Sequence, residues 1–288
     1  MINTDNQIFA RPIIEVIRSR YSVRTYMDKP LTADHKLQLN QYINDLQAQS
    51  DIGVRLKLVD SDIALQETGA RLGTYGVIKG ASSYIVTAIN NNIQNTESFG
   101  YCFEKLVLFA ASIGLGTCWM ASTFKRSAFE KAIELTSDEI MPIITPVGYP
   151  KNGSHTIETL FRMAARSNTR KEWNELFFDR NLTKPMTEEK AEEYAVALEM
   201  LRLAPSASNK QPWRIVKEND SFHFFLHRTR GYGDRFGYDI QRIDIGIAMC
   251  HFELTLLEQG AFGLWCHQKP NLHIDSKDMI YVGSWVRS

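Results

Sequence analysis

The chain has 288 residues, 44% of them hydrophobic and 11% aromatic, which is enough for a large core in one or two compact units. Its 33 Lys and Arg balance 33 Asp and Glu, so overall charge favours neither a nucleic acid nor a membrane surface as partner. The N-terminal residues lack the pattern of a secretory signal, and no apolar run is long enough to span a membrane. Without Cys-x-x-Cys pairs or His spacings typical of metal sites, we expect reduced thiols, a cytoplasmic location and no metal.

The first predicted element is an amphipathic helix from Ile13 to about Arg20, followed by an extended segment. Arg20, Ser22 and Arg24 alternate in this segment, IRSRYSVRTY, and alternation on an extended backbone places them on one face. Two guanidinium groups and a hydroxyl on one face suit a phosphate or a polyol chain. On residue chemistry alone, solvated surface arginines are the more common alternative.

Two pairs of segments repeat in the same order along the chain. KPLTAD at 29–34 and KPMTEE at 184–189 each place a Thr N-cap before a helical pattern, at an offset of 155 (184 minus 29). Apolar helices are then expected at 100–113 and 246–259, at an offset of 146 (246 minus 100). Each is followed by a glycine that suits a left-handed C′ position and by a Trp 19 residues after its first glycine. Shared order and spacing favour an internal duplication over unrelated helix ends.

Short apolar or alternating runs predict strands between these helices. The strands are expected at 54–59, 84–89 and 143–148 in the first half, and at 213–216, 222–226 and 279–283 in the second. Helices mixed with such strands indicate an α+β fold, a sheet flanked by helices. The joining segment 151–178 has a helical pattern and no Gly/Ser linker composition, so the halves 1–165 and 166–288 are expected to pack as one body.

Two further segments carry candidate binding groups. Residues 204–213, APSASNKQPW, cannot continue a helix and form a loop rich in hydroxyl and amide groups, or simply a polar surface loop with a buried Trp. Residues 114–120, GLGTCWM, follow the first apolar helix, and Gly116 permits a close approach to the backbone. For Cys118, a packed thiol is favoured over a redox role.

These segments resemble the motifs of FMN-dependent nitroreductases. IRSRYSVRTY is similar to the N-terminal basic-x-Ser-x-basic run of that family, and PSASNKQPW to its Pro-Ser-x-x-Asn-x-Gln-Pro-Trp motif. The resemblance implies that Arg20 holds the 5′-phosphate of FMN, with Ser22 and Arg24 by the ribityl chain and the pyrimidine edge. It implies further cofactor-binding residues in the loop (Pro205, Ser206, Ala207, Asn209) and at the ring edge (Thr117, Cys118, Trp119, Met120), with Gln211 and Trp213 holding the loop.

The resemblance also implies a basic residue for the phosphate after Val147-Gly148-Tyr149-Pro150. The run RKEWNEL at 170–176 is similar to the family's Arg-Lys-Pro-Leu-Glu-Glu-Leu stretch, with Trp173 in place of Pro. The candidates are Arg162, Arg166, Arg170 and Lys171, with Arg170 first and Arg166 retained as a second binding residue.

Comparing the halves predicts a single FMN. At the offset of 155, Arg20, Ser22 and Arg24 correspond to Glu175, Phe177 and Asp179, so two cations become anions, which repel a phosphate. Residues 205–213 correspond to 50–58, SDIGVRLKL, which has no Pro-Ser loop. One composite site therefore remains, as expected for a single-chain, internally duplicated branch of the family in which a monomer mimics the usual homodimer.

The activity implied by the resemblance is electron transfer from NAD(P)H through FMN to a nitroaromatic, a quinone or a similar small acceptor, by a ping-pong mechanism. No catalytic acid or base stands out, and no Gly-x-Gly-x-x-Gly motif marks a separate nicotinamide domain. The alternatives are a flavin carrier or sensor without turnover, another flavin reaction (dehalogenation, enone reduction, flavin breakdown), and an interaction protein without flavin. The Gly-rich region 231–242 is a candidate flexible segment.

Overall fold

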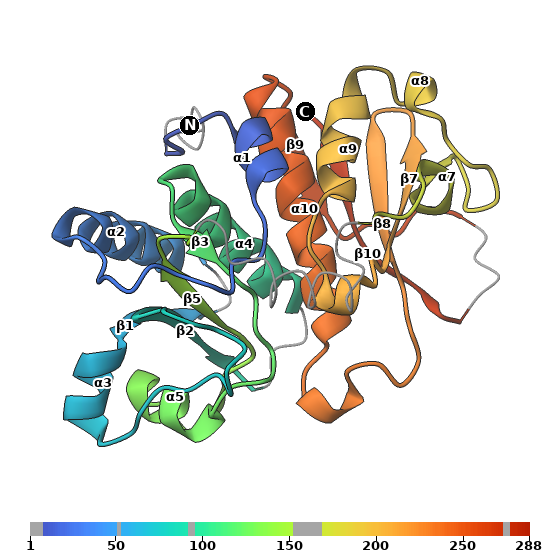
Figure 1. The fold of residues 1–288 in the computed structure, drawn as a ribbon. Helices are drawn as coiled ribbons and strands as arrows, with labels where there is room; N and C mark the ends of the chain where they lie inside the picture. Colours follow the sequence, from blue (N-terminus) through green and yellow to red (C-terminus); the bar gives the residue numbers. More distant parts are fainter. Residues whose placement is uncertain (1–7, 51–52, 92–95, 152–168, 273–276) are drawn as a thin grey trace.

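Two sheets lie on either side of a pair of long crossing helices in the computed structural model (Figure 1). The structure describes residues 8–50, 53–91, 96–151, 169–272 and 277–288. The crossing helices are α4 (Thr96–Ser112) and α10 (Ile240–Glu258). Each sheet is built from strands of one half only, in the orders β1-β2-β5-β3, with β4 beside β2, and β6-β7-β8-β10-β9. The α+β class expected from the sequence is confirmed.

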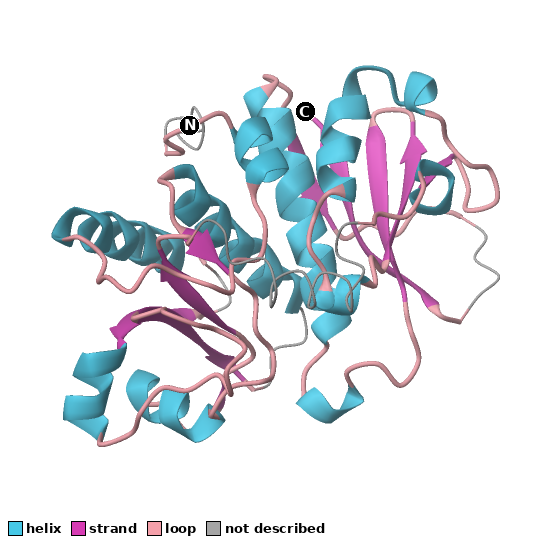
Figure 2. Cartoon of the chain, in the orientation of Figure 1, coloured by secondary structure: helices cyan, strands magenta, loops and turns pink. Residues whose placement is uncertain are grey.

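Figure 2 shows how helices and strands alternate in each half. The first half contains α1 (Ile13–Ser19), α2 (Ala33–Gln49), β1 (Arg55–Asp60), α3 (Ser61–Thr68), β2 (Ser83–Asn90), β3 (Gly116–Thr117), α5 (Arg126–Ile133), β4 (Glu139–Ile140) and β5 (Ile144–Gly148). The second half contains α7 (Trp173–Leu176), β6 (Phe177–Asp179), α8 (Glu188–Ala191), α9 (Ala195–Arg202), β7 (Trp213–Glu218), β8 (Ser221–His227), β9 (Gly263–Cys266) and β10 (Met279–Arg287). Short 3-10 turns η2 (Glu192–Tyr194), η3 (Ala207–Asn209) and η4 (Asp234–Phe236) complete it. No described helix is both long and apolar enough to cross a membrane.

All six predicted strands are present, but two helical expectations were wrong in part. The second Thr-capped helix is interrupted at Glu192, whose φ is +54°, and Thr187 stands at the N-cap position without a side-chain hydrogen bond. Thr32, by contrast, caps α2 by accepting from the amide of His35 at 3.2 Å. Most of the joining segment, 152–168, lies outside the described residues, so its helical pattern stays a prediction there. Its described end forms the one-turn helix α7 and the strand β6, so the pattern was wrong for residues 177 and 178.

The two central helices touch through the glycines that the sequence matched at an offset of 146. A Cβ on Gly246 would lie 1.9 Å from the carbonyl oxygen of Glu97, and one on Gly100 would lie 2.2 Å from that of Ile243. Neither helix can therefore carry a side chain at the crossing. This reciprocal contact agrees with the duplicated plan, which stays a prediction.

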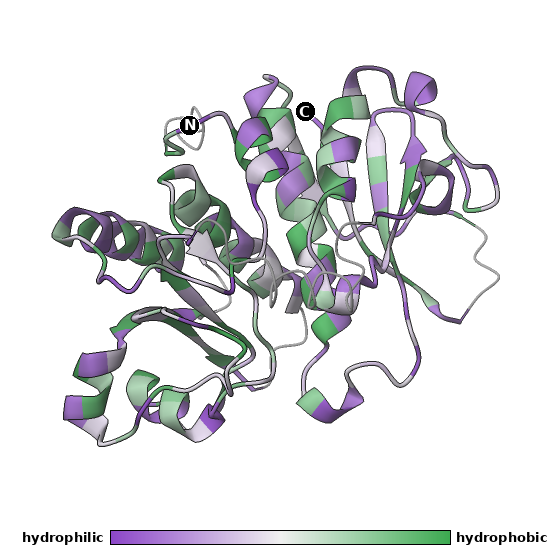
Figure 3. Ribbon diagram, in the orientation of Figure 1, coloured by the Kyte–Doolittle hydropathy of each residue, from purple (hydrophilic) through white to green (hydrophobic). Residues whose placement is uncertain are grey.

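One apolar core joins the halves across this crossing. It includes the fully buried Phe103 from the first half and Phe252 and Trp285 from the second. Hydrophilic residues cover outer elements such as α8 (Figure 3). Residues of both halves thus contribute to this core, while the division of the chain into halves at residue 165 stays a prediction.

The helix that leads to Arg20 is capped by a side chain from the other end of the chain. Pro12, at the N-cap of α1, offers no side-chain hydrogen bond. The amides of Ile13 and Ile14 instead donate to the two carboxylate oxygens of Glu258, the second at 3.1 Å. A carboxylate suits this position because the first amides of a helix lack internal partners and carry partial positive charge. The start of α1 is therefore anchored to the C-terminal end of α10.

Candidate functional site

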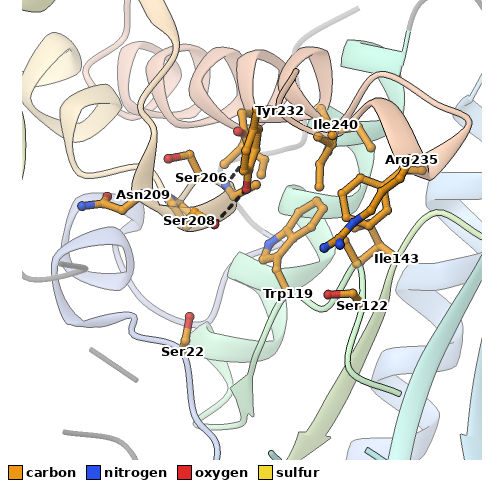
Figure 4. A pocket seen from close by; sticks show the side chains of 18 of the residues that line it. Ser22, Trp119, Ser122, Ile143, Ser206, Ser208, Asn209, Tyr232, Arg235 and Ile240 are labelled. Atoms are coloured by element: carbon orange, nitrogen blue, oxygen red, sulfur yellow. Dashed lines mark hydrogen bonds between the residues drawn. The ribbon is translucent and has the colours of Figure 1, made fainter. Parts of the chain in front are cut away.

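A cavity of about 730 Å³ opens between the halves, beside the first turns of α10. Its walls come from the segment after α1, the loop after β3, the loop before β7, residues 231–236 and α10. Figure 4 shows Ser22 on one side of this cavity and Ser206, Ser208 and Tyr232 on the opposite side. The cavity therefore collects segments more than 200 residues apart, from Arg20 to Ile247.

Arg20 and Arg170 form the basic end of the cavity. The side chain of Arg20 is 7% exposed, and its Nε and Nη1 have no hydrogen-bond partner within the described part of the chain. The guanidinium of Arg170 donates to the carbonyl oxygen of Leu203 at 2.9 Å and lies 3.4 Å from Oδ1 of Asn209. Burial lowers the pKa of Arg170 to about 10, and the charges of Arg20 and Arg202 also contribute to this lowering. Cations brought together under such burial favour an anion between them.

The loop before β7 is fixed by hydrogen bonds within and around it. Ser206 Oγ accepts from the amide of Gln211 at 2.9 Å, and the Gln211 side chain binds the carbonyl oxygen of Asn209 and the amide of Lys171. The amide of Ala207 donates to Oδ1 of Asp244 at 2.9 Å. Gln211 thus holds the loop, and Trp213 is fully buried behind it at the start of β7.

Asp244 is a buried acid in the cavity wall. It lies on α10, is 2% exposed, and its Oδ2 has no hydrogen-bond partner among the described residues. Burial raises the pKa of Asp244 well above its ordinary value, although the hydrogen bond from Ala207 opposes this shift. Burial thus favours the neutral form of this carboxyl group, and with it a cavity wall without a negative charge at this position.

Of the four predicted ring-edge residues, Trp119 lines the cavity, whereas Thr117, Cys118 and Met120 are buried behind its wall. The amide of Cys118 donates to Thr145 Oγ1 at 2.9 Å and that of Met120 to the carbonyl oxygen of Ile144 at 3.0 Å, so both donors are already used.

The space beside Gly116 is filled by protein. A Cβ at this position would lie 2.6 Å from a methyl carbon of Val23 and 3.0 Å from the ring of Pro150. The glycine therefore makes room for the extended segment between Ser22 and Arg24, and not for a ligand as its sequence context suggested.

The other predicted residues also have clear positions. Those that line the cavity are Arg20, Ser22, Arg24, Arg170, Pro205, Ser206, Ala207 and Asn209. Arg162 and Arg166 lie outside the described residues. The chain leaves α1 in an extended conformation and brings Arg20, Ser22 and Arg24 to one cavity, which Tyr21 between them also lines.

The sequence prediction missed the wall formed by residues 231–236 and by α10. Tyr232 closes against the Pro-Ser loop, with its hydroxyl 2.9 Å from Ser208 Oγ, and the side chain of Gln241 holds its carbonyl oxygen at 3.0 Å. Gly233 and Gly237 flank the turn η4 with φ of +89° and +74°. The glycines had marked 231–242 as a flexible candidate, but no sequence signal showed that this segment faces the cavity.

The fold that surrounds this cavity is that of a nitroreductase. A solved structure of a putative nitroreductase from Thermotoga maritima has a TM-score of 0.58 and 21% identity, and the match covers 96% of this chain and 94% of that one. The family model described as "Putative TM nitroreductase" matches residues 12–256. The chain therefore belongs to this nitroreductase family, which confirms the resemblance seen in its motifs.

More distant structures match about half of the chain. A nitroreductase family protein from Clostridium novyi has 20% identity and a TM-score of 0.40, over 51% of this chain and 89% of that one. A putative nitroreductase in complex with FMN from Desulfovibrio desulfuricans has 20% identity and a TM-score of 0.39, over 51% and 91%. At these TM-scores the likeness is too distant to support an argument. A search of curated proteins found no match.

Proposed function

We propose that the cavity binds one FMN and that the protein transfers electrons from NAD(P)H to a small acceptor such as a nitroaromatic or a quinone. The observation that carries this proposal is the pairing of Arg20 and Arg170 at one end of a 730 Å³ cavity. A cavity of this size lies within the range of about 300–1,000 Å³ that is usual for ligands of cofactor size.

The residues present fit such a cofactor. The buried side chain of Arg20 and the half-buried one of Arg170 suit a phosphate because guanidinium groups offer paired donors and a fixed charge. Ser22 and Ser206 add hydroxyl groups along the walls, and Trp119, Tyr232 and Phe236 add aromatic surface for a flat ring. Bound FMN would supply the redox chemistry, by accepting a hydride from the nicotinamide and passing electrons to the second substrate.

The chain itself supplies binding, orientation and electrostatics. We assign the phosphate to Arg20 and Arg170, and the ring edge to Arg24 and Trp119. A cation near the pyrimidine edge stabilises the negative charge of a reduced flavin and so favours its reduction. Tyr232, held by Ser208 and Gln241, limits the access of water to the same space.

One cofactor per chain is supported by a second, smaller cavity. It measures about 300 Å³ and is lined by Glu97, Tyr101 and Trp265, which the offset of 146 relates to Ile243, Ile247 and Trp119 of the larger cavity. Its described lining contains no arginine. At the two places that the duplicated plan relates, the larger cavity has Arg20 and Arg170 together, whereas the described lining of the smaller one has Lys105 beside the acidic Glu97. A monomer and a cytoplasmic location stay predictions.

The test is a measurement of cofactor content and reduction. The purified protein should be yellow, should release FMN on heating at a ratio near one per chain, and should lose its visible absorbance under NADPH without oxygen. A ratio near two would contradict the single site. A yellow protein that neither NADH nor NADPH bleaches would instead be a flavin carrier.

The phosphate assignment has its own test. Arg20→Glu should abolish FMN retention, because it places a carboxylate where the phosphate charge should lie. Arg18→Glu is the matched control, since Arg18 lies on the exposed side of α1 and does not line the cavity. Equal FMN affinity in the two variants would refute the role of Arg20.

A further inference from the structure

A buried carboxylate lies directly behind the basic end of the cavity. Glu104 on α4 and His251 on α10 are both 0% exposed, and Nε2 of His251 lies 2.8 Å from Oε1 of Glu104. The indole nitrogen of Trp119 donates to Oε2 of Glu104 at 2.7 Å. Nε of Arg20 lies 3.9 Å from Oε1, which is beyond hydrogen-bonding distance.

The second ring nitrogen of His251 fixes the proton count of this pair. Nδ1 lies 3.0 Å from the carbonyl oxygen of Met200. A carbonyl oxygen can only accept, so Nδ1 carries a hydrogen. Nε2 then either donates to an ionised Glu104 or accepts from a protonated one. In both arrangements the pair of Glu104 and His251 is neutral as a whole.

This neutrality matters because Glu104 is the nearest acidic partner that the structure gives Arg20. An ionised Glu104 without His251 would be a buried charge that needs a counter-ion, and the guanidinium 3.9 Å away would supply it. With His251 in place, both carboxylate oxygens already have partners. Nε and Nη1 of Arg20 remain without a hydrogen-bond partner in the described part of the chain.

We infer that His251 is a positioning residue for cofactor binding: it neutralises Glu104 so that the charge of Arg20 stays directed at the cofactor phosphate. The inference rests on the proposed function, because the phosphate is the anion in question. His251 acts from behind the cavity wall, through Glu104, and does not itself line the cavity. Glu104 in turn orients the indole of Trp119 at the cavity surface.

The test compares affinity for FMN with affinity for riboflavin, which lacks the phosphate, by fluorescence titration of the apoprotein. His251→Asn keeps a donor for the Met200 carbonyl and removes the partner of Glu104. We expect it to weaken FMN binding about tenfold or more, the size of one charge-assisted hydrogen bond, and to leave riboflavin binding unchanged. His223→Asn is the matched control, because His223 is a buried histidine of β8, 2.7 Å from Ser284 Oγ.

The decisive variant removes the carboxylate as well. His251→Asn with Glu104→Gln should return FMN affinity to within about threefold of the wild type, because no buried anion then competes for Arg20. If His251 had only a structural role, the second substitution would add to the loss, and this result would overturn the inference. Glu104→Gln alone should bind FMN at least as tightly as the wild type. Weaker binding by this variant, by about tenfold, would also overturn the inference, even if His251→Asn does not fold.

These outcomes separate the two proposals. A wild-type protein that binds neither FMN nor riboflavin would refute the proposed function, and the inference with it. A wild-type protein that binds FMN, together with a double variant that does not recover, would refute the inference alone.

Discussion

The close contact between α4 and α10 predicts how much stability a substitution at Gly246 would remove. In Gly246→Ala, the new Cβ would lie 1.9 Å from the carbonyl oxygen of Glu97, where ordinary contact begins at 3.4 Å. The helices would have to separate locally by up to 1.5 Å (3.4 minus 1.9). The position of the Cβ is fixed by the backbone of α10, and the oxygen belongs to the backbone of α4, so no side-chain rotation can relieve the overlap.

The expected loss of stability is the strain minus the gain in helix propensity. Overpacking of this kind costs about 3 kcal/mol at the upper end of its usual range. Replacing glycine by alanine inside a helix returns about 1 kcal/mol. The net loss of about 2 kcal/mol corresponds to a Tm about 5 °C lower for a chain of this size. Since Ile243 and Ile247 line the cavity on either side of Gly246, FMN retention should fall as well.

The assay is thermal unfolding followed by circular dichroism, with FMN content measured on the same samples. Gly73→Ala is the matched control, because a Cβ at Gly73 would meet nothing within 4 Å and the φ of this residue is not positive. The free energy of unfolding of this control should lie within about 1 kcal/mol of the wild-type value. A Gly246→Ala protein as stable as the Gly73→Ala protein would show that the helices tolerate separation, and would refute the reasoning.

Three other predictions can be tested with single preparations. Glu175→Arg with Asp179→Arg should not create a second flavin site, because the corresponding segment 50–58, SDIGVRLKL, has no Pro-Ser loop to complete it; a second FMN per chain would contradict this. Asp244→Asn should raise the Tm more at pH 7.5 than at pH 5, because a buried acid with a raised pKa favours the folded state only at low pH; a gain independent of pH would be the wrong outcome. The hydrogen bond from Arg55 lowers the pKa of Glu139 to about 2. The stability that Glu139 adds is therefore present above its ordinary pKa of 4.5 and is lost as the pH falls towards 2. In urea titrations, the free energy of unfolding of Glu139→Gln should be lower than that of the wild type at pH 7 and equal to it near pH 2.

The sequence predicted those parts of the site that depend on local pattern. Alternation in the segment after α1 predicted that Arg20, Ser22 and Arg24 lie together, because an extended backbone has a period of two, but it did not predict that Tyr21 lines the same cavity. Proline and hydroxyl content marked the Pro-Ser loop for a similar reason, since these residues cannot continue a helix. The long strands followed from their apolar runs.

The remaining parts depend on packing between distant segments. Residues 231–236 face the cavity because Gln241 and Ser208 hold Tyr232, and neither contact has a signal in the sequence. Thr117 lies in a strand of two residues, which is too short to show a period, so its burial was not foreseen. The role of Glu104 as a partner of His251 needs the crossing of two helices that are 147 residues apart at that contact.

The cap on α1 has a consequence for the stage of synthesis at which the basic end of the cavity can form. The amides of Ile13 and Ile14 find their carboxylate on Glu258, about 245 residues later. During synthesis, α1 and Arg20 at its end leave the ribosome long before the capping residue has been added to the chain. The basic end of the cavity can reach its final form only when nearly the whole chain has been translated. Cofactor loading is therefore expected to be a late, post-translational event, which truncation before Glu258 would prevent.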